Sequence, residues 1–234
     1  MKNIYNDQTY LKNNPDWHSK DALFKAEQIL KLIRMVPGPV LKIGEVGCGS
    51  GQILVELSDR LPEQIEFYGF DISNDALNIA RPRETPRIRI QLLDLANESE
   101  ENYFFDVLLV IDVLEHIDNY FKFLDGIIKK AKYTIFHIPL DLSVWSLFRE
   151  KMLIESKQRV GHIHNFTEDF IKSILEDHGF RILFQTYTPP SFQVKSPKAT
   201  IINNIRKLLF KVNKRVASKW IGGYSILLLT KNKL

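Results

Sequence analysis

The sequence lacks three features that each define a class of proteins. It has a single cysteine, Cys48, in 234 residues, which excludes a disulfide framework and a zinc cluster built on thiolates. Its longest apolar stretches, such as 135–140 and 226–229, are far shorter than a membrane span. The first residues contain no apolar core of the kind found in secretory signals. We therefore expect a soluble, intracellular protein located in the cytoplasm.

Acidic residues are missing from one long segment. Between Lys195 and Lys219 the sequence has eight basic residues and no acid, whereas the whole chain carries a net charge of +4. The remainder of the chain is therefore mildly acidic. A nucleic-acid-binding face usually spreads its Lys and Arg side chains over a wider surface, so we expect no DNA partner.

Short apolar runs alternate with helical patterns along most of the chain. Buried runs separated by amphipathic helices predict a mostly parallel sheet that is covered on both faces. The predicted strands are 41–46, 65–71, 87–92, 105–111, 133–138, 181–186 and 224–230, and the predicted helices are 21–35, 51–61, 74–80, 119–131 and 168–178. We expect an α/β fold with seven strands, six of them parallel and the last in the sequence antiparallel.

A glycine-rich loop follows the first predicted strand. Gly47, Gly49 and Gly51 alternate with other residues immediately before a predicted helix. Glycine lets the backbone turn sharply and approach a ligand closely, and a helix N-terminus offers unpaired N–H groups. A dinucleotide fingerprint would need glycine where Gln52 stands, and the loop has no P-loop lysine. The loop therefore indicates a ligand site of another kind.

An acid ends the second predicted strand. The carboxyl ends of parallel strands share one edge of a sheet, so Asp71 is expected beside the glycine loop, where a ribose diol could donate two hydrogen bonds to it. The alternative is that Asp71 caps the following helix, a role that Ser73 or Asn74 could also take. Together with the glycine loop, the ligand interpretation is favoured.

At these residues the sequence resembles the class I S-adenosylmethionine-dependent methyltransferases. The resemblance spans residues 40–180 and continues in Leu93-Asp94-Leu95 after the third strand and in Leu114-Glu115-His116-Ile117 after the fourth. It implies a Rossmann-like fold and S-adenosylmethionine as the cofactor. The cofactor contacts that it implies are Glu45, Gly47, Cys48, Gly49, Gly51, Asp71, Ile72, Asp94, Leu95 and Ile111. Within this set Cys48 is interpreted as a small packing residue and not as a nucleophile.

Methyl transfer is an in-line displacement, and a hydroxyl acceptor must also lose a proton. The catalytic candidates at the carboxyl edge of the sheet are Asp112, His116, His162 and His164. We favour His162 and His164, because their loop has little apolar reason to carry two histidines. The alternative for each histidine is simple packing or hydrogen bonding within the fold.

Candidate substrate contacts lie in two places. Trp17 and His18 precede the first helix and are predicted to belong to a lid, although Trp17 could simply anchor the N-terminal arm. His137 alternates within a buried predicted strand, which also favours a packed side chain. We expect no metal site, because the acid ligands typical of metal-dependent O-methyltransferases are not recognisable near His162 or His164.

The acid-free segment lies in an insertion at about 189–223. Its apolar residues fall on one face of a predicted helix over 201–219. This helix could pack on the domain, guide an anionic acceptor, or make weak contact with a membrane surface. Because its apolar face lacks a tryptophan-rich rim, we rank the anionic acceptor above the membrane.

The sequence therefore predicts an S-adenosylmethionine-dependent methyltransferase that acts on a small-molecule acceptor, with the hydroxyl of a sugar or nucleotide-linked sugar as the candidate. The alternatives are a methyltransferase acting on RNA or another macromolecule and a non-catalytic S-adenosylmethionine-binding protein. The predicted organisation is an N-terminal arm and lid helix over 1–39 and a methyltransferase domain over 40–234. No oligomeric state follows from the sequence.

Overall fold

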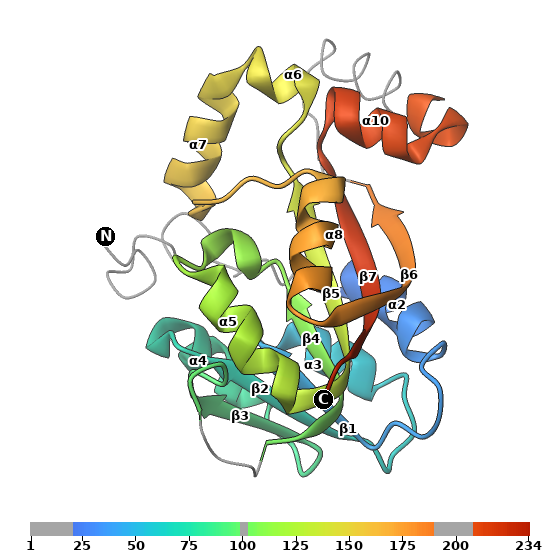
Figure 1. Ribbon diagram of the computed structural model, residues 1–234. Coiled ribbons are helices and arrows are strands. Elements are labelled where there is room, and N and C mark those ends of the chain that lie inside the picture. Colours follow the sequence, from blue (N-terminus) through green and yellow to red (C-terminus); the bar gives the residue numbers. More distant parts are fainter. Residues whose placement is uncertain (1–20, 99–102, 190–207) are drawn as a thin grey trace.

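The structure is a computed structural model that describes residues 21–98, 103–189 and 208–234. At its centre lies a seven-stranded sheet with the strand order β3-β2-β1-β4-β5-β7-β6 (Figure 1). The strands are β1 (Lys42–Val46), β2 (Glu66–Asp71), β3 (Ile88–Leu92), β4 (Phe105–Ile111), β5 (Ala131–Leu140), β6 (Phe180–Thr188) and β7 (Tyr224–Asn232). Only β7 runs antiparallel to its neighbours. The predicted strands and the Rossmann-like sheet are confirmed.

Helices cover both faces of the sheet (Figure 1). They are α2 (Ala22–Ile33), α3 (Gln52–Ser58), α4 (Asn74–Ala80), α5 (Tyr120–Ile127), α6 (Val144–Leu147), α7 (Glu150–Val160), α8 (Glu168–Asp177) and α10 (Lys214–Ile221). The sequence analysis did not predict α6 or α7. Because α7 buries none of its residues, no apolar stripe marks it in the sequence.

Alternating side chains of the central strands form two hydrophobic cores. In β4, Leu108 and Val110 pack into the core that includes residues of α5 and α8, whereas Val107 and Leu109 pack into the core that includes residues of α2, α3 and α4. All four side chains are fully buried. Successive residues of a strand point to opposite faces, so a nearly continuous apolar run is what a strand covered on both faces requires.

The predicted single helix over 201–219 is wrong within the part that the structure describes, which begins at residue 208. Residues 208–212 are helical, but Asn213 is extended (φ −154°, ψ 105°) and its side chain accepts a hydrogen bond from the Val216 amide, so that α10 starts anew. The apolar face is also not packed away, because Val212 is 78% exposed and Val216 47%. The capping preference of asparagine overrides the helical periodicity at this point.

The parallel strands end at one edge of the sheet, and α6, α7 and α10 lie beyond that edge (Figure 1). Contacts between α6 and α10 join two segments that are far apart in the sequence. Among the described residues no helix is long and apolar enough to cross a membrane. The carboxyl edge is the region where an open α/β sheet binds its ligands. Among the described residues, Asp71, Asp112 and Asp141 lie at the carboxyl ends of β2, β4 and β5.

Candidate active site

The glycine loop joins β1 to α3 at this edge. Gly47, Gly49 and Gly51 all have positive φ angles, of 65°, 54° and 71°. A Cβ atom at Gly47 would lie 2.8 Å from Cγ2 of Val113, which follows β4. Positive φ disfavours other residues, and the close contact leaves no room for a side chain. Glycine at position 47 therefore keeps the loop tightly against the end of β4.

Asp71, at the end of β2, is tied to the same loop. Its Oδ2 accepts a hydrogen bond from the Gly49 amide (2.9 Å) and its Oδ1 accepts one from the Ser73 amide (2.8 Å). Burial raises the pKa of the Asp71 carboxyl, although these amides act in the opposite direction. A carboxylate oxygen has more than one lone pair, so both oxygens can still accept further bonds. The cap of α4 is Ser73, whose Oγ accepts a hydrogen bond from the Ala76 amide. Asp71 therefore does not cap this helix, and its role in ligand binding stays a prediction.

A cavity of about 320 Å³ opens beside Asp71, lined by Ile72, Asn74, Asp75, Leu92, Leu93 and Asp94. Ile72 is 56% exposed and Leu92 49%, so two apolar side chains lie open to solvent at the cavity. The carboxylate of Asp94 accepts a hydrogen bond from the side-chain Nδ2 of Asn97 (2.6 Å). This combination of apolar surface with the carboxylates of Asp75 and Asp94 can hold a flat heterocycle that carries an amino group.

Glu45 lies in β1 just before the glycine loop and is only 2% exposed. Its Oε2 has no hydrogen-bond partner among the described residues. Burial raises its pKa to about 8, with Lys25 lowering it and Asp71 raising it. A buried carboxyl group in this state either keeps its proton or meets a cationic ligand.

Asp112 follows β4 and links three other side chains. Its Oδ2 lies 2.7 Å from Nζ of Lys25, and its Oδ1 lies 2.5 Å from Nδ1 of His137, whose Nε2 lies 2.7 Å from Oγ1 of Thr188. Asp112 also has a φ of 53°, which is uncommon outside glycine. Burial alone would raise its pKa, but His137 and Lys25 outweigh that effect and hold the pKa well below its usual range. Asp112 is thus a fixed anion and a poor proton acceptor, and both ring nitrogens of His137 are engaged.

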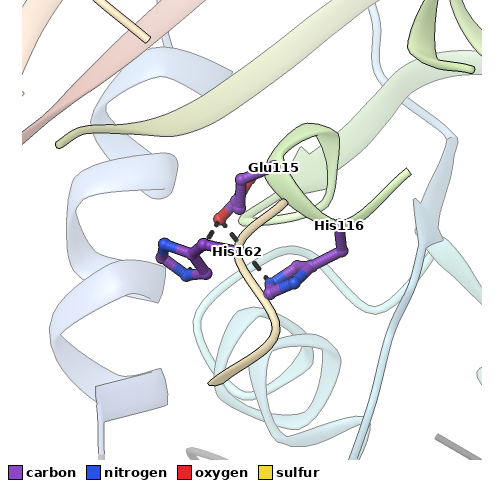
Figure 2. Close-up of side chains that lie close together, drawn as sticks. All are labelled: Glu115, His116 and His162. Carbon is purple, nitrogen blue, oxygen red and sulfur yellow. Dashed lines mark ion pairs between the residues drawn. The ribbon is translucent and has the colours of Figure 1, made fainter. Parts of the chain in front are cut away.

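Glu115, His116 and His162 come together next to this network (Figure 2). Glu115 and His116 belong to the short helix Leu114–His116 after β4, whereas His162 follows α7. Oε1 of Glu115 lies 3.9 Å from Nε2 of His116 and 4.0 Å from Nε2 of His162. Glu115 is fully buried, and neither of its oxygens has a hydrogen-bond partner among the described residues. Burial, followed by the charge of Asp112, raises its pKa well above the usual range.

The two favoured histidines have different surroundings. His162 Nδ1 lies 2.7 Å from Oδ2 of Asp141, and the ring keeps 16% of its surface exposed. His164 instead uses Nε2 to reach the Ile117 carbonyl oxygen (3.0 Å), and its ring packs edge-on against Tyr120. This geometry favours a structural role for His164 and leaves His162 as the stronger chemical candidate.

The remaining predicted positions lie mostly in the core. Cys48, Leu95 and Ile111 are buried among the hydrophobic cores, which favours packing over a direct ligand contact. Trp17 and His18 lie outside the described residues. The sequence analysis missed Lys25, Thr188 and Asp141. Of these, Asp141 carried a usable signal, because it directly follows a strand at the carboxyl edge.

Comparison with known proteins identifies the fold family. The model of a family described as a methyltransferase domain matches residues 25–185. The chain belongs to this family. It is a class I S-adenosylmethionine-dependent methyltransferase, with S-adenosylmethionine as its cofactor.

Individual relatives of this methyltransferase are distant. A ubiquinone biosynthesis O-methyltransferase from Rickettsia typhi is 24% identical over 223 residues, covering 83% of this chain and 82% of that protein. The N-methyltransferase NodS from Bradyrhizobium japonicum, solved with S-adenosylhomocysteine, has a TM-score of 0.60 at 16% identity, covering 97% of this chain and 96% of that one. A Haloferax volcanii protein solved with the Trm112 methyltransferase activator has a TM-score of 0.66 at 14% identity, with the same coverage. The solved structures share the fold.

Proposed function

We propose that this methyltransferase transfers the methyl group of S-adenosylmethionine to an oxygen atom of a small-molecule acceptor. The observation that carries this proposal is the convergence of Glu115, His116 and His162 just after Val113, the residue that packs against the glycine loop at Gly47. A hydroxyl acceptor must lose its proton during transfer. The imidazole rings of His116 and His162 are groups that can receive that proton. The Rickettsia typhi relative is named as an O-methyltransferase, which agrees with an oxygen acceptor.

The chemistry of the described residues fits the cofactor. The cavity lined by Ile72 and Asp94 suits the adenine ring, and Asp71 suits the ribose hydroxyls. The orphaned Oε2 of Glu45 suits the ammonium group of the methionine part. A Cβ atom at Gly47 would lie 2.8 Å from Val113, so glycine is what lets the loop lie this close to the end of β4. Once bound, the cofactor supplies a methyl group on a positively charged sulfur.

The side chains of this chain would then align and activate the acceptor. Lys25 bonds to Asp112 and influences the charge state of both Glu45 and Glu115, so the proposed cofactor pocket and the Glu115 cluster adjoin each other. Because Asp141 accepts from Nδ1 of His162, the Nε2 atom of the neutral ring carries the lone pair. Asp141 is therefore a positioning residue for His162.

The identity of the acceptor stays a prediction. None of the relatives named above is described as acting on a sugar, so the sugar hydroxyl predicted from the sequence gains no support. An anionic acceptor guided by the basic segment also stays a prediction. Of the basic residues that the structure describes there, Arg215 and Lys219 are already paired with Asp169. A membrane-surface contact and a cytoplasmic location are likewise predictions.

The direct test is to incubate the full chain with S-adenosylmethionine and a panel of small molecules bearing hydroxyl, amine or thiol groups. Formation of S-adenosylhomocysteine should depend on the hydroxyl compounds. The variant His162→Gln should lose turnover by about 10²–10⁴-fold, while its affinity for S-adenosylhomocysteine stays near that of the wild type. Product formation with amines alone would contradict the proposal.

A further inference from the structure

Three potential metal-binding side chains face one another at the end of β4. In Glu115, His116 and His162, one donor atom from each lies within 4.8 Å of the other two. Figure 2 shows the two imidazole rings approaching the carboxyl group from different chain segments, with dashed lines to Glu115. The ring centroids of His116 and His162 are 4.9 Å apart. Two imidazoles and one carboxylate form a donor set that binds divalent transition metals.

The hydrogen bonds of the two rings define which nitrogen faces the cluster. His162 Nδ1 donates to Asp141 Oδ2 at 2.7 Å, and His116 Nδ1 lies 3.1 Å from the Gly161 carbonyl oxygen. Carboxylate and carbonyl oxygens only accept, so each Nδ1 carries the proton in the neutral ring. Each Nε2 then presents a lone pair toward Glu115. This is the arrangement in which a metal-binding histidine is oriented by an outer-shell oxygen.

The carboxyl group of Glu115 gives an independent sign of a missing ligand. It is fully buried, and neither oxygen has a hydrogen-bond partner among the described residues. An unpartnered buried carboxyl costs free energy that a bound cation would recover. The side chains of His116 and His162 each keep 16% of their surface exposed, so a cation has a path from solvent.

We propose that Glu115, His116 and His162 bind one divalent transition cation such as Zn²⁺ or Co²⁺ and leave a coordination position open toward the methyl acceptor. The two nitrogen donors disfavour Mg²⁺ and Ca²⁺, which prefer all-oxygen sites. Tetrahedral bonds of about 2.1 Å place donor atoms about 3.4 Å apart. The observed distances of 3.9 and 4.0 Å exceed this by about half an ångström. The donor atoms of His116 and His162 lie within 4.8 Å of each other, so binding also requires side-chain rotations that bring the two rings closer. The proposal replaces the sequence-based expectation that the protein has no metal site.

Its chemical role rests on the proposed oxygen acceptor. A hydroxyl bound to the cation loses its proton to water more readily. The resulting oxygen anion attacks the methyl carbon, so an O–CH₃ bond forms as the S–CH₃ bond breaks. The bond electrons return to sulfur, which leaves as neutral S-adenosylhomocysteine, and one proton is released for each methyl group transferred.

The test is a titration of Co²⁺ and of Zn²⁺ into the chelator-treated full chain, followed by calorimetry and, for Co²⁺, by visible absorption. We expect one equivalent to bind the wild type. His162→Gln should bind more than about 100-fold more weakly, because outer-shell partners alone contribute about 10–100-fold. Asp141→Asn should weaken binding of the cation by about 10–100-fold.

The matched control is His178→Gln. His178 also places Nδ1 2.7 Å from a carboxylate, Asp125, but it lies outside the cluster. This variant should bind the cation as the wild type does. Glu115→Gln supplies a second variant of the site, and circular dichroism shows whether each variant is folded.

Absence of saturable binding at one equivalent would overturn the metal proposal, as would equal affinities in the wild type, His162→Gln and folded Glu115→Gln. Methylation assays in excess chelator separate a failure of the metal proposal from a failure of the proposed function. If hydroxyl methylation continues unchanged in excess chelator, the metal proposal fails and oxygen methylation stands. If the cation binds but only amines are methylated, the metal site stands and the oxygen acceptor fails.

Discussion

Replacing Asp112 with asparagine should destabilise the protein through Lys25. Asparagine keeps the shape of the side chain, tolerates the positive φ of 53°, and can still accept from His137 Nδ1. What it removes is the negative charge that lies 2.7 Å from the Lys25 ammonium group. Lys25 then keeps its own charge with only 18% of its side chain exposed.

The structure sets the size of this effect. Breaking a buried ion pair by removing one partner typically costs about 3–5 kcal/mol. The side chains of Asp112 and Lys25 retain 26% and 18% exposure, which places the expected loss near the lower limit, at about 3 kcal/mol. That corresponds to a shift of about 100-fold in the unfolding equilibrium. In the double variant Lys25→Met/Asp112→Asn no unpaired charge remains, so the loss should be smaller than the sum of the single losses.

Urea unfolding followed by circular dichroism measures each free energy. Lys132→Met is the matched control, because Lys132 also lies 2.7 Å from an aspartate, Asp106, but its side chain is 52% exposed. Such an exposed pair contributes about 1 kcal/mol or less. A loss in Asp112→Asn no larger than in Lys132→Met would refute the account of this network, as would strict additivity in the double variant.

Three further predictions concern the cofactor pocket. Asp71→Ala should weaken S-adenosylhomocysteine binding by about 2–4 kcal/mol, because two charge-assisted bonds to the ribose are lost; unchanged affinity in calorimetry would place the ribose elsewhere. Gly47→Ala should weaken binding at least about tenfold, because the new Cβ would lie 2.8 Å from Val113. Its control is Gly38→Ala, at a φ of 88° with open space around it, which should lose stability without losing cofactor affinity. Burial raises the pKa of Glu45 to about 8 in the folded protein, whereas a glutamate in the unfolded chain ionises near pH 4. Between these values only the unfolded state gains the charge, so the free energy of unfolding falls as the pH rises from about 4 to 8. Glu45→Gln should therefore reduce the decline in the unfolding free energy of the cofactor-free protein between pH 5.5 and 7.5, and identical slopes would contradict this.

Much of the fold could be predicted because its strands are buried on both faces. The run in β4 is apolar from Val107 to Ile111, and the boundaries of the strand at Phe105 and Ile111 agree with the sequence. Elements that bury little could not be found in this way. The helix α7 has no buried residue, and the break at Asn213 depends on one side-chain cap within an otherwise periodic segment.

The candidate site was predictable where it follows strand ends. Asp71 and Asp112 stand directly after apolar runs, and parallel strands bring such positions to one edge. The pairing of Asp112 with Lys25 could not be predicted, because it joins β4 to a helix that precedes the sheet. The approach of His162 to Glu115 depends on the path of the chain after α7, which no local pattern encodes.

The most direct test of the account is a crystal structure of the protein with S-adenosylhomocysteine. The account predicts adenine in the cavity beside Ile72 and Asp94, the ribose hydroxyls on Asp71, and the amino group toward Glu45. The sulfur atom should then face Glu115, His116 and His162, where the acceptor binds. A ligand bound away from the glycine loop, or a sulfur atom directed away from that cluster, would contradict the central claim.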